Sequence, residues 1–271
     1  MVIPFDYFAG HCVLLQCRLD DRRDAKVIFD TGSGVSVLSE TLLAELGHPV
    51  TGRVHRGRRM SGQELVLPLT DLGSVTIDTL RRAPFTVAAF DMSRFSVGGA
   101  TPDGLLSLGL FETTPVTEDR RSRTLVVEDP ASLRRREGAG ISVPVRVRRE
   151  AVEVSFFLDL QLPSGRVARV EVDTGSDDLI LHERFMGELG ISPGAAGVRT
   201  VEGSDETGHR FVRYGANLKG AISPAGFDQL AQRDPPVIFQ NIIYDGLIGH
   251  SFLRPYAVTY DLPRSRMIFS R

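Results

Sequence analysis

The sequence predicts a mainly β protein made of two similar lobes, and two observations lead to this fold class. The first is a repeat: "VIFDTGSGVS" (27–36) and "VEVDTGSDDL" (170–179) share Asp-Thr-Gly-Ser after an apolar run, with Asp30 and Asp173 143 positions apart. The second is the character of the segments around these turns, which are short, apolar and rich in β-branched residues, as strands are. Long alternation of strands and helices is absent from the pattern.

The repeat extends over most of the chain. Three further pairs of segments recur with a shift of 142 or 143 positions: "LLAELG" (42–47) with "FMGELG" (185–190), "PDGLLSLG" (102–109) with "YDGLIGHS" (244–251), and "VTEDRRSRTLV" (116–126) with "VTYDLPRSRMIF" (258–269). We therefore expect an N-terminal lobe at residues 1–128 and a C-terminal lobe at residues 141–271. The segment 129–140 is rich in Arg, Gly and Ala without apolar periodicity, which predicts an exposed linker.

The elements of each lobe are expected in the same order. "HCVLLQCRL" (11–19) and "AVEVSFFLDL" (151–160) each precede a turn and then a strand that ends in Asp-Thr-Gly-Ser. One short helix is expected to follow in each copy. In the first copy Ser39 is placed to cap this helix, and Gly47 is placed to end it after an apolar face of leucines.

Composition and spacing exclude several classes of function. The 34 acidic and 32 basic residues nearly balance, which argues against a nucleic-acid partner held by bulk charge. Cys12 and Cys17 lie five positions apart in a predicted strand and so point to opposite faces, which argues against a disulfide. The six histidines are scattered, without a metal-binding spacing. We therefore expect no metal and no cofactor.

The sequence also bears on the compartment. No apolar run reaches membrane-spanning length, and "MVIPFDYFAG" (1–10) lacks the basic and apolar regions of a signal peptide. We expect no membrane partner. As the chain stands, the expected location is cytoplasmic, and periplasmic or secreted if its start is trimmed.

The doubled turn predicts acid–base chemistry. If a pseudo-twofold axis relates the lobes, Asp30 and Asp173 face each other, and two carboxyls that close hold one proton between their two titrations. One carboxylate can then take a proton from water while the other, protonated, polarises a carbonyl. The neighbouring residues have supporting roles: tight turning for Gly32 and Gly175, hydrogen bonds to main-chain groups for Thr31 and Thr174, and donation to the carboxylates for Ser33 and Ser176.

On these residues the sequence resembles the aspartic proteases of the pepsin and retropepsin group, most closely bacterial members with two fused copies. The resemblance rests on the doubled Asp-Thr-Gly-Ser, on the elements Leu105-Leu106-Ser107 and Leu247-Ile248-Gly249, and on "FLRPYAVTYDLPRSRMIF" (252–269). It implies a bilobal acid-protease fold, a water activated by Asp30 and Asp173, and loops locked together through Thr31 and Thr174. It further implies an endopeptidase that acts as a monomer on a peptide or protein substrate. Because the pair must keep one proton, we expect activity at mildly acidic pH, and Ser33 and Ser176 should shift the optimum lower by stabilising the ionised carboxylates.

Three positions depart from the family pattern. Ser107 replaces a glycine, and His250 stands where an aspartate is common; we expect the serine to be tolerated and the histidine to be structural. No tyrosine lies between Asp30 and Asp103 to serve the flap over the cleft. The flap candidates are "RGRRMSGQE" (56–64) and "VEGSDETGH" (201–209), one hairpin from each lobe. Their candidate substrate-binding residues are Met60, Ser61, Gly62, Gly203 and Ser204.

Two other functions remain open at this point. One is a catalytically silent peptide-binding protein of the same fold. The other is a nucleotide-binding phosphotransferase of the actin or sugar-kinase type, whose phosphate loops also follow strands in two lobes. The short chain, the absence of long predicted helices and the lack of a Gly-Gly adenosine element argue against this second alternative.

Overall fold

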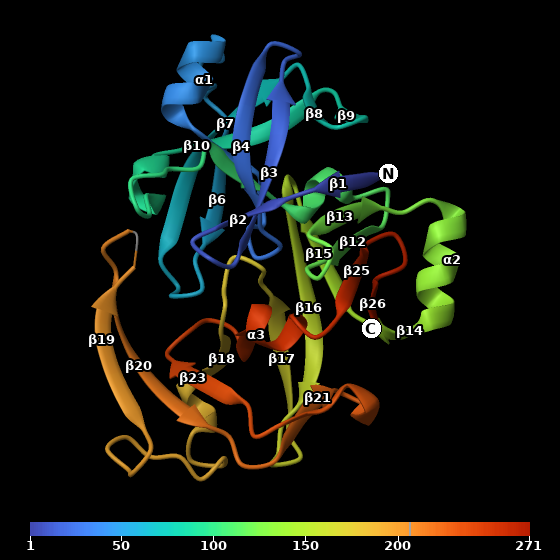
Figure 1. Ribbon diagram of the computed structural model, residues 1–271. Helices are drawn as coiled ribbons and strands as arrows, with labels where there is room; N and C mark the ends of the chain where they lie inside the picture. The colour runs from blue at the N-terminus through green and yellow to red at the C-terminus, as the bar shows by residue number, and fades with distance from the viewer. Residues whose placement is uncertain (206) are drawn as a thin grey trace.

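The computed structural model describes residues 1–205 and 207–271, and in these the strands form two ten-stranded sheets and one six-stranded sheet. The N-terminal lobe lies at the top of Figure 1, in blue to green, and most of the C-terminal lobe lies at the bottom, in yellow to red. Each lobe is built around one of the ten-stranded sheets. The six-stranded sheet takes strands from both halves of the chain and joins the lobes.

The sheet of the N-terminal lobe begins and ends with a hairpin. In spatial order its strands are β6 (Val54–Arg58), β7 (Glu64–Leu72), β10 (Phe85–Phe90), β5 (Val37–Ser39), β11 (Gly104–Leu106), β4 (Arg23–Phe29), β3 (Cys12–Leu19), β8 (Val75–Ile77) and β9 (Leu80–Arg82), with β2 (Asp6–Phe8) paired to β3.

The sheet of the C-terminal lobe repeats this order strand for strand. Its members are β19 (Arg199–Ser204), β20 (Arg210–Asn217), β23 (Pro236–Gln240), β18 (Leu179–His182), β24 (Gly246–Ile248), β17 (Val167–Val172), β16 (Glu153–Gln161), β21 (Ala221–Pro224) and β22 (Gln232–Arg233), with β15 (Arg146–Glu150) paired to β16. The predicted fold class, mainly β with two similar lobes, is confirmed.

The six-stranded sheet is symmetric about its centre. Its order is β1 (Val2–Pro4), β13 (Thr124–Val127), β12 (Val116–Asp119), β25 (Ala257–Asp261), β26 (Arg266–Ser270) and β14 (Gly140–Pro144). The two central strands are antiparallel, and Thr117 pairs with Thr259, its counterpart in the repeat. Their hydroxyls lie 2.7 Å apart, so the pseudo-twofold axis passes between these two threonines.

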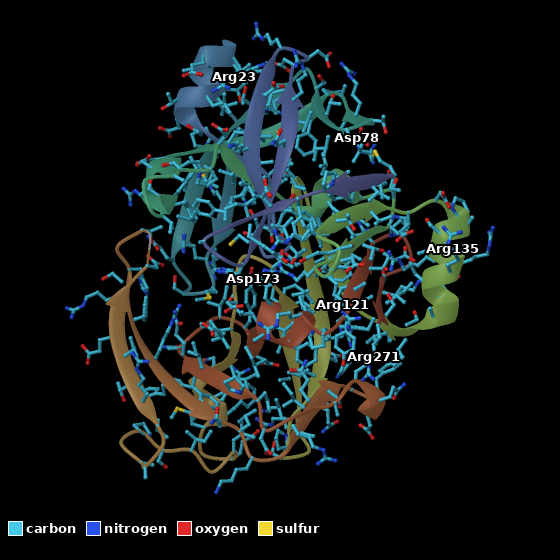
Figure 2. All side chains as sticks on the ribbon, in the orientation of Figure 1. Arg23, Asp78, Arg121, Arg135, Asp173 and Arg271 are labelled. Atoms are coloured by element: carbon cyan, nitrogen blue, oxygen red, sulfur yellow. The ribbon has the colours of Figure 1, made fainter. Side chains whose placement is uncertain are left out.

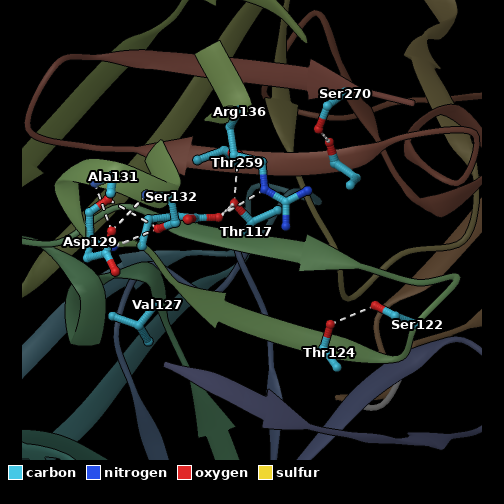
Figure 3. A network of polar contacts seen from close by, with 12 residues as sticks. Thr117, Ser122, Thr124, Val127, Asp129, Ala131, Ser132, Arg136, Thr259 and Ser270 are labelled. Carbon is cyan, nitrogen blue, oxygen red and sulfur yellow. Dashed lines mark hydrogen bonds and ion pairs between the residues drawn. The ribbon is translucent and has the colours of Figure 1, made fainter. Parts of the chain in front are cut away.

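A buried polar network surrounds this axis (Figure 3). The Thr117 hydroxyl also contacts Glu128 Oε1 (2.6 Å), and Arg136 Nε donates to the same oxygen (3.1 Å). Glu128 is 4% exposed, so the guanidinium compensates a carboxyl that burial would otherwise leave costly. The network fixes the C-terminal end of the first lobe against the second.

One apolar core runs through both lobes and lies directly beneath the site. From Phe156 to the end of β16 the buried residues alternate with less buried ones, as the two-residue period of a strand requires. Phe29 of the first lobe and Phe156 of the second both pack edge-to-face on Tyr260, at ring-centroid distances of 6.2 and 6.1 Å. All three rings are fully buried. Because Phe29 immediately precedes Asp30, this packing fixes the backbone of the first turn.

The helices are short. They are α1 (Glu40–Leu46), α2 (Pro130–Ala139), α3 (His250–Leu253) and the 3-10 turns η1 (Met92–Phe95), η2 (Leu108–Phe111), η3 (Glu183–Phe185) and η4 (Asp228–Leu230). Within the described residues, none is long and apolar enough to cross a membrane.

One sequence expectation needs correction here. A helix was expected in both copies, but the second has only η3, because Gly187 stands where α1 has Ala44 and glycine disfavours helix by about 1 kcal/mol. The segment expected as an exposed linker is largely exposed, and most of it forms α2, which the sequence did not predict. The N-cap residue of α2, Asp129, accepts hydrogen bonds from the Ala131 and Ser132 amides. Leu133 is the only buried residue of α2, so the sequence has no apolar stripe from which this helix could be predicted.

Candidate active site

Each aspartate stands at the end of a central strand, in the same local geometry. Asp30 follows β4 and its N–H donates to Leu106 O (3.0 Å), while Asp173 follows β17 and its N–H donates to Ile248 O (3.0 Å). The accepting strands, β11 and β24, run parallel to β4 and β17. The two copies of the repeat therefore present their carboxyls on equivalent frames.

The threonines bind the two turns to each other. Thr31 N–H donates to Thr174 Oγ1 and Thr174 N–H donates to Thr31 Oγ1, both at 3.0 Å. The hydroxyls in turn donate across the axis, from Thr31 to Val172 O (2.7 Å) and from Thr174 to Phe29 O (3.3 Å). Both threonines are 0% exposed, so these four bonds form in a dry, low-dielectric setting in which each broken bond is costly.

The two carboxyl groups meet between the lobes and share a hydrogen bond. Figure 2 shows Asp173 at the centre of the molecule, between the upper and lower lobes. The glycines of the turns make this approach possible. A Cβ at Gly32 would overlap the Asp173 carboxyl, and one at Gly175 would lie 2.8 Å from Asp30 Oδ2. Any side chain at either position would push the aspartates apart.

Backbone amides, rather than serine hydroxyls, bind the carboxylates. Gly32 N–H (2.9 Å) and Ser33 N–H (3.3 Å) donate to Asp30 Oδ1, and Gly175 N–H donates to Asp173 Oδ1 (2.9 Å). The Ser33 hydroxyl donates to Val35 O instead (2.8 Å). The expectation that Ser33 donates its hydroxyl to Asp30 is therefore wrong.

The same correction applies to Ser176. Its hydroxyl accepts from Asp178 N–H (3.3 Å), and it is the Ser176 amide that bonds Asp173. In both turns the hydroxyl of the serine three residues after the aspartate bonds to a nearby main-chain group of the same turn. The two serine hydroxyls therefore do not supply the hydrogen bonds to the carboxylates that we predicted from the sequence.

The pair has an uneven electrostatic balance. Burial raises the pKa of Asp30, against which the amides of Gly32 and Ser33 and the bond to Asp173 act. Burial raises the pKa of Asp173 well above its usual value, and the nearby negative charge of Asp30 adds to this. Burial and the mutual repulsion of the two carboxylates therefore favour a state in which the pair holds one proton between its two carboxyls.

A cleft of about 380 Å³ lies over the pair and takes residues from both lobes. Both aspartates are partly exposed to it. The hairpin β6–β7 contributes to its wall, and Met60, one of the predicted flap residues, lines it. An apolar wall from Leu65, Leu67 and Phe90 continues along the first lobe. The cleft is therefore a groove with the two carboxyls on one side and an apolar wall along the first lobe.

The predicted flaps both form hairpins, β6–β7 and β19–β20, although Glu206 of the second candidate lies outside the described residues. The hairpins contact each other: Arg59 Nε lies 3.4 Å from Asp205 Oδ2, and Thr207 Oγ1 donates to Gln63 Oε1 (2.7 Å). Two hairpins therefore meet tip to tip.

Four of the five predicted flap residues do not line the cleft. Ser61 and Gly62 form the turn of the first hairpin, where Gly62 has a φ of +83° and faces Ile243. Gly203 and Ser204 lie in β19, while the second hairpin reaches the cleft through Arg213 of β20. The spacing of glycines located the hairpins, but the side of the hairpin that faces the cleft depends on strand register.

The departures from the repeat also have local explanations. Ser107 fits because its hydroxyl lies 3.2 Å from that of Ser36, whose oxygen accepts the Ser107 amide (3.0 Å). At Gly249 there is no such room, since a Cβ would overlap Ser176 O. His250 is 1% exposed and packs edge-to-face on His11, and burial beside Arg120 lowers its pKa to about 2. It lies in the core at the start of α3.

Sequence reasoning missed several polar residues of the cleft, which are His55, Glu153, Ser155, Glu171, Arg213 and Tyr244. For Glu171 a signal was present, since it is a charged residue two positions before Asp173, and residues two apart in a strand share a face. The others come from β6, β16, β20 and the loop between β23 and β24, and only the folded chain brings these segments together. Among the described residues, no group of three or more His, Cys, Asp or Glu is placed to hold a metal ion.

Part of the N-terminal lobe matches a known protein family. Residues 15–110 match the family model described as "Aspartyl protease". The match contains the first turn, with Asp30, and the β11 segment that supports it. It supports a protease-like fold for the N-terminal lobe. The second lobe has the same strand order but lies outside the matched range.

Solved structures resemble the chain over its full length. The crystal structure of conglutin gamma, a basic 7S globulin from lupine seeds, has a TM-score of 0.55 and 11% identity, covering 100% of this chain and 94% of that one. Basic 7S globulin from soybean has a TM-score of 0.55 and 10% identity, covering 99% and 95%. These likenesses show the two-lobed fold alone. No curated protein sequence matches the chain.

The observed fold also bears on the nucleotide-binding alternative. Nucleotide-binding folds of the actin or sugar-kinase type have lobes with long helices packed on a sheet. Here the helices of the described residues are short, and each lobe is built around a β-sheet. The glycines of the two turns approach the opposite aspartate rather than an open space for phosphate. The fold and the turn geometry therefore argue against the nucleotide-binding alternative.

Proposed function

We propose that this protein is an aspartic endopeptidase whose single active site lies between the two lobes of one chain. The observation that carries the proposal is the contact of Asp30 and Asp173, held by reciprocal threonine bonds at the floor of a groove. The family match at residues 15–110 supports it. A monomer suffices, because both halves of the site come from the same chain.

In the proposed mechanism the pair starts with one proton, carried by Asp173, whose pKa both burial and the charge of Asp30 raise. A water held between the carboxyls loses a proton to ionised Asp30 as its oxygen attacks the peptide carbonyl carbon, while protonated Asp173 donates to the carbonyl oxygen. The product of this step is a neutral tetrahedral diol. Asp30, now protonated, donates to the amide nitrogen as the C–N bond breaks, and Asp173 recovers a proton from the diol. Each proton is accounted for, and no covalent bond to the protein forms.

The direct test is cleavage of a diverse peptide library at several pH values, with products read by mass spectrometry. The expected result is hydrolysis of internal bonds in extended peptides, lost in the Asp30→Asn variant. Intact peptides at every pH from 3 to 8, with a protein shown to be folded, would overturn the proposal. Insensitivity to a pepstatin-type inhibitor alone would not, because the flap lacks the usual tyrosine.

We expect kcat/KM to have a bell-shaped pH profile. Activity needs one proton on the pair, so it rises through the lower apparent pKa and falls through the higher one. Burial raises the pKa of both carboxyls, so both flanks should lie above the value of about 3.9 for a free aspartate. Ser33→Ala should leave the flanks in place, because the Ser33 amide and not its hydroxyl bonds Asp30. A maximum below pH 3, or a steady rise to pH 9, would contradict this.

A second candidate is a peptide-binding protein that does not cleave. It is favoured by one observation, the full-length likeness to two structures that are named as globulins rather than as proteases. A shared fold leaves function open. Binding of library peptides by the wild-type protein without any product would select this candidate.

A further inference from the structure

A second group of acidic side chains lies in the cleft beside the aspartate pair. Glu171 is two residues before Asp173 on β17 and lines the same cleft. Residues two apart in a strand share a face and lie about 6–7 Å apart, so the Glu171 side chain is one step along the groove from Asp173. The equivalent position of the first lobe is Ile28, which is 4% exposed and does not line the cleft. The feature therefore breaks the symmetry of the repeat.

Glu171 is buried without compensation. It is 7% exposed, and its carboxyl has no hydrogen-bond or ion-pair partner among the described residues. The charged groups that act on it are Asp173, Asp30 and Glu153, all of them acidic. A carboxyl in such a place costs free energy that a solvated one does not, unless a cation or donor reaches it. Burial and these charges raise the pKa of Glu171 well above its usual value.

Glu153 extends the acidic surface toward the first lobe. It comes from β16, its Oε1 accepts from Ser155 Oγ (2.9 Å), and its Oε2 lies 3.7 Å from His55 Nε2 on the flap strand β6. Its stem packs against Gly34, where a Cβ would overlap it. The ring of Tyr244, which packs on Phe157 at 5.4 Å between centroids, supplies an aromatic wall. Two carboxyls and one ring thus surround one section of the groove.

We propose that Glu171, Glu153 and Tyr244 form a subsite for a basic side chain, lysine or arginine, of the peptide substrate. This inference rests on the proposed function and names the substrate class of that same site. A basic side chain is a long apolar stem ending in a cation, which matches an aromatic wall ending in carboxyls. It supplies to Glu171 the partner that the chain itself does not. The three residues are specificity-determining and take no part in bond cleavage.

The position of the subsite fixes the position of the basic residue. An extended peptide advances about 3.3 Å per residue, and Glu171 is one strand period from the dyad. The preferred lysine or arginine should therefore lie within two residues of the cleaved bond. The basic residues that also line the cleft have other partners: Arg58 with Glu64 (3.1 Å), Arg59 with Asp205 (3.4 Å) and Arg213 with Gln240 (2.8 Å).

The preference should depend on pH. The titratable and charged groups around Glu171 are Asp30, Asp173, Glu153 and Tyr244, with His55 and Arg148 facing Glu153 from β6 and β15. At low pH Glu171 is neutral and the subsite accepts uncharged residues. As pH rises the carboxylate forms, and a bound cation favours its formation. Selectivity for lysine therefore increases with pH, whereas the catalytic pair loses its proton as pH rises and cleavage becomes slower.

The test uses internally quenched peptides that differ at one position, with lysine, norleucine or glutamate there, placed around the bond that the library identifies. In the wild type, kcat/KM for lysine should exceed that for norleucine by about tenfold or more at pH 7, and by less at pH 4.5. In Glu171→Gln the ratio should fall to about one while the norleucine peptide is still cleaved, and Glu153→Gln should lower it in part. The matched control is Glu45→Gln, which removes an exposed carboxyl of α1 and should keep the wild-type ratio.

Folding of the variant can be checked independently. A carboxyl whose pKa is raised in the folded state stabilises that state at low pH and loses this contribution as pH rises through the folded pKa, so Glu171→Gln should have an unchanged or higher Tm at pH 7. Cleavage with no preference for lysine or arginine at any position near the bond, or a preference that persists in Glu171→Gln, would overturn the subsite and leave the protease intact.

If the wild type cleaves nothing, binding decides the subsite separately. Fluorescence anisotropy of the labelled lysine and norleucine peptides, with the wild type and Glu171→Gln at pH 7, is then the readout. If the wild type binds the lysine peptide more tightly and Glu171→Gln abolishes this difference, the subsite is supported although the protease function is excluded. Equal binding of the two peptides, or none, would overturn the subsite as well.

Discussion

Asp30→Asn and Asp173→Asn are each expected to lower kcat/KM by about 10³-fold or more, because an amide can neither accept a proton from water nor hold one for the carbonyl. The two losses should be similar, since one proton serves both carboxyls and either substitution destroys the shared state. The measurement is steady-state cleavage of one library-derived peptide at the pH of maximal activity. Turnover within tenfold of wild type in either variant would exclude the pair as the catalytic groups.

The fold should survive these substitutions. Both carboxyls have raised pKa values, so they lose stabilising free energy as pH rises, and asparagine should give an unchanged or higher Tm at pH 7. The matched control is Asp24→Asn on the same strand, β4. Its carboxyl pairs with Arg18 at 3.1 Å and is 78% exposed. This variant should keep full activity, because surface pairs contribute little.

Thr174→Val is expected to lower both stability and activity. The substitution keeps the shape of the side chain but removes a hydroxyl that accepts from Thr31 N–H and donates to Phe29 O, both buried. Leaving these groups without partners should cost about 2 kcal/mol or more in the free energy of unfolding, which corresponds to about 4–8 °C in Tm. Because the same bonds hold the turns in register, kcat should fall as well.

Thr174→Ser is the control for this prediction. It keeps the hydroxyl and removes one methyl group, so most of the stability and activity should remain. Thr31→Val and Thr31→Ser should behave in the same way, since Thr31 has the equivalent contacts with Thr174 N–H and Val172 O. A Thr174→Val variant with wild-type Tm and kcat would show that the reciprocal bonds do not hold the site.

Much of this architecture could be predicted from the sequence because the sequence contains an internal repeat. The shift of 142 to 143 residues pairs Asp30 with Asp173 and Thr117 with Thr259, and the structure places each pair together. A motif repeated at matched positions reports a symmetric contact, and symmetry brings distant residues together without any knowledge of the strands between them. The lobes, their class and the meeting of the turns follow from that.

Asymmetric features were harder to predict. The Ser33 hydroxyl donates to Val35 O rather than to Asp30, and residue type alone does not show this. The helix α2 is held by its Asp129 cap and by contacts with β14 and β26 rather than by an apolar face. Glu153, His55 and Tyr244 come from β16, β6 and the loop between β23 and β24, so their convergence beside Glu171 depends on strand register that no local pattern encodes.

The measurement that tests the central claim most directly is a neutron structure of crystals grown in D₂O near the pH of maximal activity. It should show Asp30 and Asp173 within hydrogen-bond distance, one deuteron on the pair, and a water bound to both carboxyls. A pair with no deuteron or with two, or carboxyls too far apart to share one, would contradict the proposed chemistry.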